Sequence, residues 1–393
     1  MTRFKQFWST YWLAGMLVLN VPVAEAQEIT ISAQYLGGAS AQFENTTPPA
    51  AFCDRWSNYC GNREVIDLAI TYVKEVIEAD IRDQYYIKMP SGRKVDVFND
   101  QTGESHTLDF EFTAVGQRTS GPSWTQSPLY NSDLSGGCTR GRSAANPPWV
   151  LFLWEVKNPR SPVACYSRYY RAQPDYHAVV SAGEMGVLYN LTMPAPYRMK
   201  PGIYRGSAIY TIGPGGDFDF GNGVTQLSDN SLTINFVLDV QHAFFFDFPP
   251  GSDRAVLEPR GGWQNWLTGG AVPQRLYRDL PFKLSSTGPF KVYKLCQYDM
   301  GMLCGLRTDD GDQVPVQLAL SLPAGIQYQG RPVERLPLPT GRVQALQFDA
   351  VTTTLNRPGQ LHFEVGKDDV RGMLAHAGST YTGQVTVVFD AEL

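Results

Sequence analysis

Six cysteines have the most definite chemistry in the chain: Cys53, Cys60, Cys138, Cys165, Cys296 and Cys304. Six cysteines allow 15 pairings, and their order favours neighbours: the first with the second, the third with the fourth, and the fifth with the sixth. An even number behind an export signal is typical of disulfides formed in an oxidising compartment. A zinc site is the alternative, but the chain lacks Cys-x-x-Cys and its five histidines are scattered. We therefore expect disulfides.

Motifs for catalysis or nucleotide binding are absent: there is no G-x-S-x-G, H-E-x-x-H, P-loop or dinucleotide fingerprint. His177 lies two residues from Asp175, a spacing that is common by chance in a surface loop. Two acidic groups in Gly-rich turns could seed a calcium or glycosidase site, namely Asp217 and Asp219, and Asp309, Asp310 and Asp312. Solvated loop carboxylates are the usual explanation, so we expect no enzyme, no metal and no cofactor. A secreted carbohydrate-active enzyme is the less favoured alternative.

A basic stretch runs from Cys138 to Arg205, with nine basic residues against three acidic ones. Arginine binds carboxylates and sulfates bidentately, and tyrosine rings pack on sugars. The stretch therefore indicates a surface for an acidic host-cell glycan or glycoprotein, with the candidates Arg140, Arg142, Arg168, Arg171, Tyr169 and Tyr170. Scattered, solvated cations are the alternative. The whole chain has a net charge of −5, which argues against nucleic-acid binding.

The N-terminus has the pattern of a secretory signal peptide. Basic residues at 3 and 5 precede an apolar run over 11–23, and Ala24-Glu25-Ala26 matches a signal-peptidase site. The run is too short for a stable membrane span, and no later stretch reaches the required length. We predict a signal peptide over residues 1–26 and a mature, exported chain from Gln27.

Turn formers and aromatic residues are abundant, with 37 Gly, 27 Pro, 20 Tyr and 20 Phe, which favours an all-β fold. The run 149–156 (WVLFLWEV) predicts a strand buried on both faces. Residues 84–89 and 94–98, separated by Pro90-Ser91-Gly92, predict a hairpin. The run 67–76 suits either a helix or a twisted strand.

The composition of the sequence changes near residue 241. An aromatic run over 243–248 predicts a strand, and two prolines end it. We place a domain boundary there, giving domains 27–241 and 242–393. Six or seven strands in the second domain suggest an immunoglobulin-like sandwich. Its last strand has apolar or Gly residues at alternate positions, including Tyr381, Val385, Val387 and Phe389. That strand is either the end of a complete sandwich or the edge of one that a partner strand completes.

Three segments in the second half resemble the minor tip subunits of class 5, or alternate chaperone-usher, fimbriae. They are Cys296-Gln-Tyr298-Asp299-Met-Gly301, the stretch 356–361 and Tyr381-Thr-Gly383-Gln-Val385. In the first half, the order of the cysteine pairs and the motif Ser181-Ala-Gly183-Glu184 are also similar to this family. The family includes colonisation-factor tip adhesins and cable-pilus initiators.

This resemblance implies two immunoglobulin-like β-sandwich domains in tandem, an adhesin domain followed by a pilin domain that lacks its last strand. A periplasmic chaperone supplies the missing strand first, and the major pilin subunit replaces it by donor-strand exchange at the outer-membrane usher. Tyr381, Val385, Val387 and Phe389 would form the edge of the donor-strand groove. The implied function is that of a tip adhesin and assembly initiator, exported through the periplasm to the fimbrial tip. A purely structural initiator without receptor binding is the alternative.

The sequence departs from the family in two places. The basic residues of the family's receptor site are missing, because Gly213-Pro214-Gly215-Gly216 occupies one stretch and prolines precede Cys53. That site is therefore not carried over. The second cysteine of the pilin domain also differs, since the family position corresponds to Asn356, and Cys304 stands closer to Cys296 instead.

Overall fold

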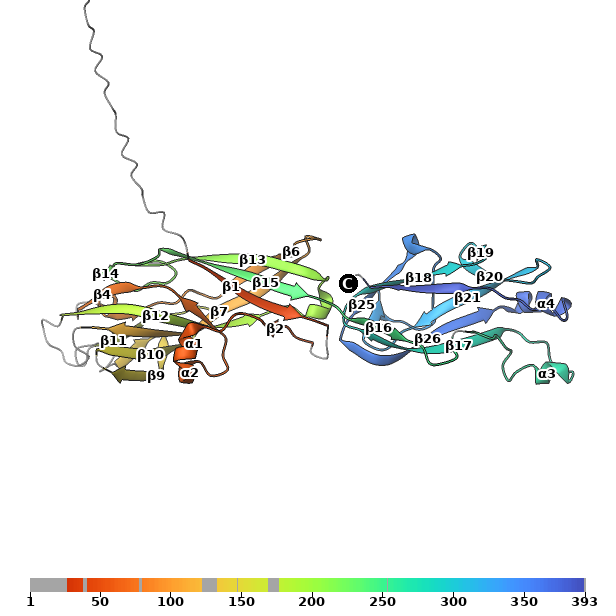
Figure 1. Ribbon diagram of the computed structural model, residues 1–393, viewed down its shortest axis with the longest axis horizontal. Helices are drawn as coiled ribbons and strands as arrows, with labels where there is room; N and C mark the ends of the chain where they lie inside the picture. The colour runs from red at the N-terminus through yellow and green to blue at the C-terminus, as the bar shows by residue number, and fades with distance from the viewer. Residues whose placement is uncertain are drawn as a thin grey trace, which may run out of the picture.

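The computed structural model describes residues 27–37, 41–77, 80–121, 133–146, 148–168, 177–252 and 254–391. The predicted signal segment, residues 1–26, lies outside them. The described chain is all-β, as predicted, and forms two bodies that lie end to end along the long axis (Figure 1). No helix in this part of the chain has the length and apolar character that a membrane crossing requires.

The first body contains one large sheet and one small one. The path of the large sheet is β14 (Val224–Thr225), β4 (Tyr72–Ile77), β12 (His177–Thr192), β7 (Ser105–Ser120), β6 (Arg93–Asn99), β13 (Gly202–Thr211), β15 (Ser231–Val240), β1 (Gln27–Tyr35) and β2 (Glu44–Asn45). Three strands branch from it: β3 (Val65–Leu68) on β12, β10 (Trp149–Val156) on β7, and β9 (Cys138–Asn146) on β10. The small sheet has the order β5 (Tyr85–Ile87), β11 (Cys165–Arg168), β8 (Asp133–Gly136).

The large sheet folds over so that its two halves enclose a common core. Phe110 on β7 packs edge-to-face on Phe236 of β15, with ring centroids 5.1 Å apart, and Phe112 packs on Tyr210 of β13 at 5.5 Å. All four rings are almost fully buried. Aromatic side chains bury large areas, so these edge-to-face pairs anchor the two halves to each other.

Strand β10 is buried on both faces, as its apolar sequence predicts. Its even residues, such as Phe152 and Trp154, belong to the main core. Its odd residues Leu151 and Leu153 belong to a second cluster beneath the short helices that follow residue 50. A strand between two apolar layers has no polar side, which explains its near-continuous hydrophobic sequence.

The predicted hairpin 84–98 is wrong. Strand β5 pairs with β11, whereas β6 pairs with β7 and β13. The three side chains Tyr85, Tyr86 and Ile87 are all buried, so β5 requires cover on both faces. The chain therefore crosses from one sheet to the other between them instead of reversing. The ambiguous run 67–76 is not helical; it belongs to the two short strands β3 and β4.

The second body is a sandwich of two sheets. One sheet has the order β16 (Phe244–Asp247), β17 (Leu276–Ser286), β26 (Thr354–Val365), β21 (Gln313–Ser321), β20 (Leu303–Arg307), β19 (Asp299–Met300), with β24 (Leu336–Pro337) on β21. The other has the order β23 (Arg331–Pro332), β22 (Ile326–Tyr328), β25 (Leu346–Ala350), β18 (Phe290–Cys296), β27 (Val385–Asp390). Between them lies a core that includes Phe282, Phe290 and Phe348.

Helices are short and lie outside the sheets. They are α1 (Ala51–Arg55), α2 (Ser57–Cys60), α3 (Gln264–Leu267) and α4 (Lys367–Ala375), together with the 3-10 turns Ile81–Asp83, Pro196–Arg198 and Arg342–Gln344. Three disulfides are present, Cys53–Cys60, Cys138–Cys165 and Cys296–Cys304, with Cα separations of 5.8, 5.3 and 5.1 Å. These are the neighbour pairs that the chain order favours, and the separations are ordinary for disulfides.

Helix α1 is anchored by a ring that presses into the sheet. Gly116 on β7 and Gly186 on β12 are directly paired, and Phe52 lies over both. A Cβ atom would lie 2.5 Å from the Phe52 ring at Gly116 and 2.6 Å from it at Gly186. Asp67 accepts hydrogen bonds from the backbone N–H groups of Phe52 and Ala51 at the start of the helix. The paired glycines thus form the seat for this helical segment.

His242 joins the two bodies. Its Nε2 donates to the Met199 carbonyl at 2.8 Å, and its ring meets Tyr35 edge-on at 5.8 Å, both in the first body. On the second body, a Cβ atom at Gly288 would lie 2.3 Å from the His242 ring. Nδ1 is buried without a hydrogen-bond partner. Burial lowers the pKa of His242, and the bond to Met199 only partly offsets this.

We predict that Gly186→Ala destabilises the first body by about 1–3 kcal/mol, because the added methyl group displaces Phe52 from its seat. Gly183→Ala on the same strand is the matched control, since its Cβ would meet only Thr71 Cγ2, at an ordinary 3.7 Å. Equilibrium unfolding in urea measures both variants. Equal stability of the two would contradict the role of the paired glycines.

We predict that the contact between the two bodies at His242, here called the junction, weakens in acid. Above a pH of about 6.5 His242 is neutral whether the junction is formed or not, so its protonation has no effect. As the pH falls from 6.5 through the lowered pKa, the undocked state takes up the proton first, and docking loses about 1.4 kcal/mol per unit of depression. Small-angle X-ray scattering at pH 7.5 and 5.0 should show separation of the bodies in the wild type but not in His242→Gln. The same pH response in both proteins would show that His242 does not cause the separation.

Candidate functional site

The last strand of the second body has one unpaired side. Among the described residues, β27 pairs only with β18, and β16 pairs only with β17, so both are edge strands. They belong to different sheets, yet Phe246 on β16 and Phe389 on β27 have ring centroids 4.4 Å apart. Phe389 also lies 5.9 Å from Phe282 in the core. The two edges therefore flank the same side of the sandwich.

Five apolar side chains along these edges are only partly buried: Phe244, Phe246, Val385, Val387 and Phe389. We call this set the β16–β27 edge. On β18, by contrast, the core residues Phe290 and Val292 are fully covered. A sandwich core whose residues stay half-exposed beside an unpaired strand is a site for β-strand addition. Of the four residues predicted for a groove edge, Val385, Val387 and Phe389 lie here.

Tyr381 does not lie in β27. Its hydroxyl donates to Asp312 in the turn before β21, and Thr382 exchanges backbone hydrogen bonds with Arg307 of β20. These bonds fix the segment that enters β27.

A buried lysine supports the strand beside this edge. Lys294 on β18 lies opposite Val387 and is 1% exposed. Its ammonium group donates to the carbonyls of Leu338 and of Met302, the latter at 3.0 Å. Burial lowers its pKa. These bonds tie β18 to two loops, so the strand that carries β27 is fixed by its own contacts.

In the first body, three of the four predicted basic residues, Arg140, Arg142 and Arg168, lie on two strands whose first residues are joined by the Cys138–Cys165 disulfide. Arg140 and Arg142 are exposed on β9, and Arg140 donates to Ser143 at 2.6 Å. Arg168 ends β11, but its side chain, like Tyr169, Tyr170 and Arg171, lies outside the described residues. Whether the set forms one surface stays a prediction.

A β-bulge in β12 positions the glutamate of the Ser181-Ala-Gly183-Glu184 motif. Glu184 has φ = 44°, an uncommon value for a residue with a side chain, and the pairing with β7 shifts there. Its carboxylate accepts from Arg118 and Arg55, both at 2.8 Å, and from the Trp56 indole. Burial alone raises the pKa of Glu184, but these donors outweigh it and hold the pKa below its usual value. The bulge thus links the helical segment to the sheet.

Of the two groups of turn carboxylates, Asp217 and Asp219 pair with arginines. Asp219 is almost buried and binds Arg82 through both oxygens, at 2.8 and 3.0 Å. Asp217 binds Arg93 at 2.6 Å. Burial raises the pKa of Asp219, yet the Arg82 hydrogen bonds bring it below the usual value. No group of three or more metal-ligating side chains occurs in the described part of the chain.

A Ser-His-Asp relay that no sequence motif indicates lies on the outer face of the second body. His362 Nδ1 donates to Asp279 at 2.7 Å, because a carboxylate can only accept. Its Nε2 is 2.8 Å from the Ser321 hydroxyl. Three adjacent strands, β17, β26 and β21, bring these residues together from distant parts of the sequence.

The relay has the distances of a catalytic triad but not its access. His362 is only 5% exposed. Arg335 crosses over it, donating from its backbone N–H to the Ser321 oxygen at 2.9 Å and from its side chain to Asp279 at 3.3 Å. The serine oxygen is therefore already an acceptor, and the arrangement acts as a clasp between strands.

The chain was compared with known families, curated proteins and solved structures. No family model matches the chain, and no curated protein matches it. Three solved structures are similar to it, each with 10% identity. A chain from a chaperone–tip adhesin complex of CFA/I fimbriae covers 94% of this chain and 96% of its own, with a TM-score of 0.26. A mutant of the CFA/I enterotoxigenic E. coli adhesin CfaE covers 93% and 95%, with a TM-score of 0.27.

The third structure is a chain of the CsuC-CsuE chaperone–tip adhesion subunit complex from the archaic chaperone-usher Csu pili of Acinetobacter baumannii. It covers 93% of this chain and 98% of its own, with a TM-score of 0.22. All three structures concern fimbrial tip subunits, the class that the sequence resembles. Scores this low do not define the fold, which the strand pairings above define.

We predict that Ser321→Ala lowers the free energy of unfolding of the second body by about 1–2 kcal/mol, since it leaves His362 Nε2 and the Arg335 backbone N–H without a partner. Ser379→Ala is the control, because Ser379 is exposed and its hydroxyl bonds to nothing in the described structure. The native wild-type chain should also resist a fluorophosphonate serine probe. Labelling of Ser321 would show that the clasp is open to substrate.

Proposed function

We propose that this chain is a fimbrial tip adhesin and assembly initiator. Residues 1–26 are its signal peptide, 27–241 its adhesin domain and 242–393 a pilin domain completed by a strand from another subunit. In this proposal the chain passes through the periplasm to the cell surface, and its successive partners are a periplasmic chaperone, the outer-membrane usher and the major pilin. The N-terminal domain then binds a host-cell glycan or glycoprotein at the fimbrial tip.

The observation that carries the proposal is the β16–β27 edge. Within the described chain, no cluster of buried residues and no sheet includes residues from both sides of 241, so the second body depends on its own core. That core is partly uncovered where β27 lacks a neighbour. A strand with alternating apolar residues would pair with β27 and cover Val385, Val387 and Phe389.

The energy available supports strand exchange between subunits. Full burial of a Val or Phe side chain contributes about 1.5–3 kcal/mol, and these side chains are already partly covered. Covering several of them, with new backbone hydrogen bonds of about 1 kcal/mol each, stabilises the complex by several kcal/mol. A purely structural initiator would also need a donor strand on this edge. Receptor binding therefore requires a separate test.

We predict that a donor strand stabilises the mature chain. Residues 27–393 fused at the C-terminus, through a flexible linker, to a peptide of alternating apolar and polar residues should melt about 10 °C above the unfused chain. The control is the same peptide with its alternation inverted, because a slip of one residue turns the apolar face away from the core. Differential scanning calorimetry and size-exclusion chromatography measure the effect.

An unfused chain that is monomeric, and as heat-stable as the fusion, would show that the second body is already complete. A Val387→Asp variant of the fusion should lose most of the gain, since the charge lies where the donor strand would cover it.

A further inference from the structure

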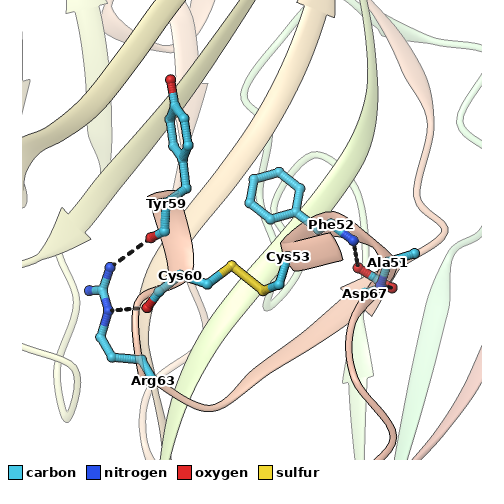
Figure 2. Close-up of a disulfide and its surroundings, with 7 residues drawn as sticks. All are labelled: Ala51, Phe52, Cys53, Tyr59, Cys60, Arg63 and Asp67. Atoms are coloured by element: carbon cyan, nitrogen blue, oxygen red, sulfur yellow. Dashed lines mark hydrogen bonds between the residues drawn. A yellow bond between two sulfur atoms is a disulfide. The ribbon is translucent and has the colours of Figure 1, made fainter. Parts of the chain in front are cut away.

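A disulfide and the Arg63 side chain hold the segment that contains Tyr59 and Cys60 (Figure 2). The Cys53–Cys60 disulfide closes it on one side. Arg63 folds back beneath it, donating from Nε to the Cys60 carbonyl at 3.1 Å and from Nη2 to the Tyr59 carbonyl at 3.0 Å. The loop is therefore fixed by a covalent bond and by two hydrogen bonds from one guanidinium group.

The same guanidinium group joins the loop to β10. Its positive charge is balanced there by the carboxylate of Glu155. Arg63 Nη1 donates to both oxygens of Glu155, at 2.8 and 2.9 Å. Both bonds come from one nitrogen, and hydrogen bonds between charged groups are shorter and stronger than neutral ones. The two charges cancel, so Arg63 and Glu155 form a neutral, fixed frame.

A bulge in β9 brings a second arginine to this frame. The pairing of β9 with β10 shifts between Phe152 and Trp154, where Gly141 lies so close to the sheet that a Cβ atom would be 2.9 Å from the Leu153 carbonyl. The residue after it, Arg142, lines a depression of about 390 Å³ together with Asn58, Tyr59, Asn62, Arg63 and Glu155. A volume of this size lies within the range of small-ligand sites.

Three polar side chains around the depression have no hydrogen-bond or ion-pair partner in the described structure. They are Asn58, Asn62 and Arg142, and all three residues are exposed. Two amides and a guanidinium group are flat, and the amides both donate and accept, which matches the hydroxyl groups of a sugar ring. Burial raises the pKa of Tyr59, and the positive charge of Arg142 opposes this, so the field of Arg142 reaches the depression.

Because Arg63 and Glu155 cancel, Arg142 supplies the net charge of the site. We propose that this depression binds one acidic sugar residue of a host glycan, with its carboxylate or sulfate on Arg142 and its hydroxyl groups on Asn58 and Asn62. The inference rests on the proposed adhesin function, and it assigns the site to the disulfide loop and one face of β9.

The test uses the mature chain, stabilised by a fused donor strand, and three probes on a biosensor: a sialylated, a sulfated and a neutral form of the same oligosaccharide. The wild type should prefer an acidic probe, and the probe it prefers distinguishes carboxylate from sulfate. Arg142→Ala should weaken that binding roughly tenfold or more, and the double variant Asn58→Ala/Asn62→Ala to a similar extent. Neither change removes an internal contact, so the melting temperature should not move.

Arg205→Ala is the matched control, because it removes one exposed arginine that pairs with Asp100 on a different part of the body. It should bind as the wild type does. Arg140→Ala removes an equal charge two residues from Arg142 but outside the depression. A loss equal to that of Arg142→Ala would show a diffuse cationic surface and overturn the site.

Unchanged binding in Arg142→Ala would overturn the site while leaving an adhesin with another receptor surface. A wild type that binds none of the acidic probes would overturn the inference and the acidic-glycan receptor together. The assembly role is decided independently by the response to the donor strand.

Discussion

The second body depends on one constraint, that a β-sandwich core must be covered on every side. Its strands cover Phe290 and Val292 completely, but β27, which carries Phe389, pairs on one side only among the described strands. The same edge exposes the backbone of β27 and the side chains of β16. Both requirements, for hydrogen bonds and for apolar cover, are met by one extended strand. An edge of this kind therefore suits an added strand better than a small ligand, as the proposed function requires.

The first body meets the same requirement within its own chain. Its large sheet folds over itself, and the outer face of β10 is covered by the helical segment that Phe52 anchors on paired glycines. That cover is attached by a disulfide, by Asp67 and by the Arg63–Glu155 pair. A short loop held at so many points loses little conformational entropy when it binds. The element that covers this part of the core is thus also held in one fixed conformation.

Several clusters of polar side chains in this chain differ in whether a ligand could reach them. Ser321, His362 and Asp279 lie at triad distances, yet Arg335 donates to the serine oxygen and His362 is buried. Asp219 is similarly committed to Arg82. Arg142 has no such partner among the described residues and is exposed beside a depression. Residue types alone did not separate these cases, because partners that occupy a side chain come from distant strands.

The sequence by itself determined the all-β class, the apolar strand 149–156 and the alternation around Val387, because burial on one or two faces is written into local periodicity. Cysteine order also favoured the observed pairs. Only the tertiary structure decided which strands are neighbours: β5 pairs with β11 and not with β6, and β16 lies beside β27 from the other end of the domain. The depression lined by Asn58, Asn62 and Arg142 arises in the same way. Pairing joins segments far apart in the chain, and no local pattern specifies the partner.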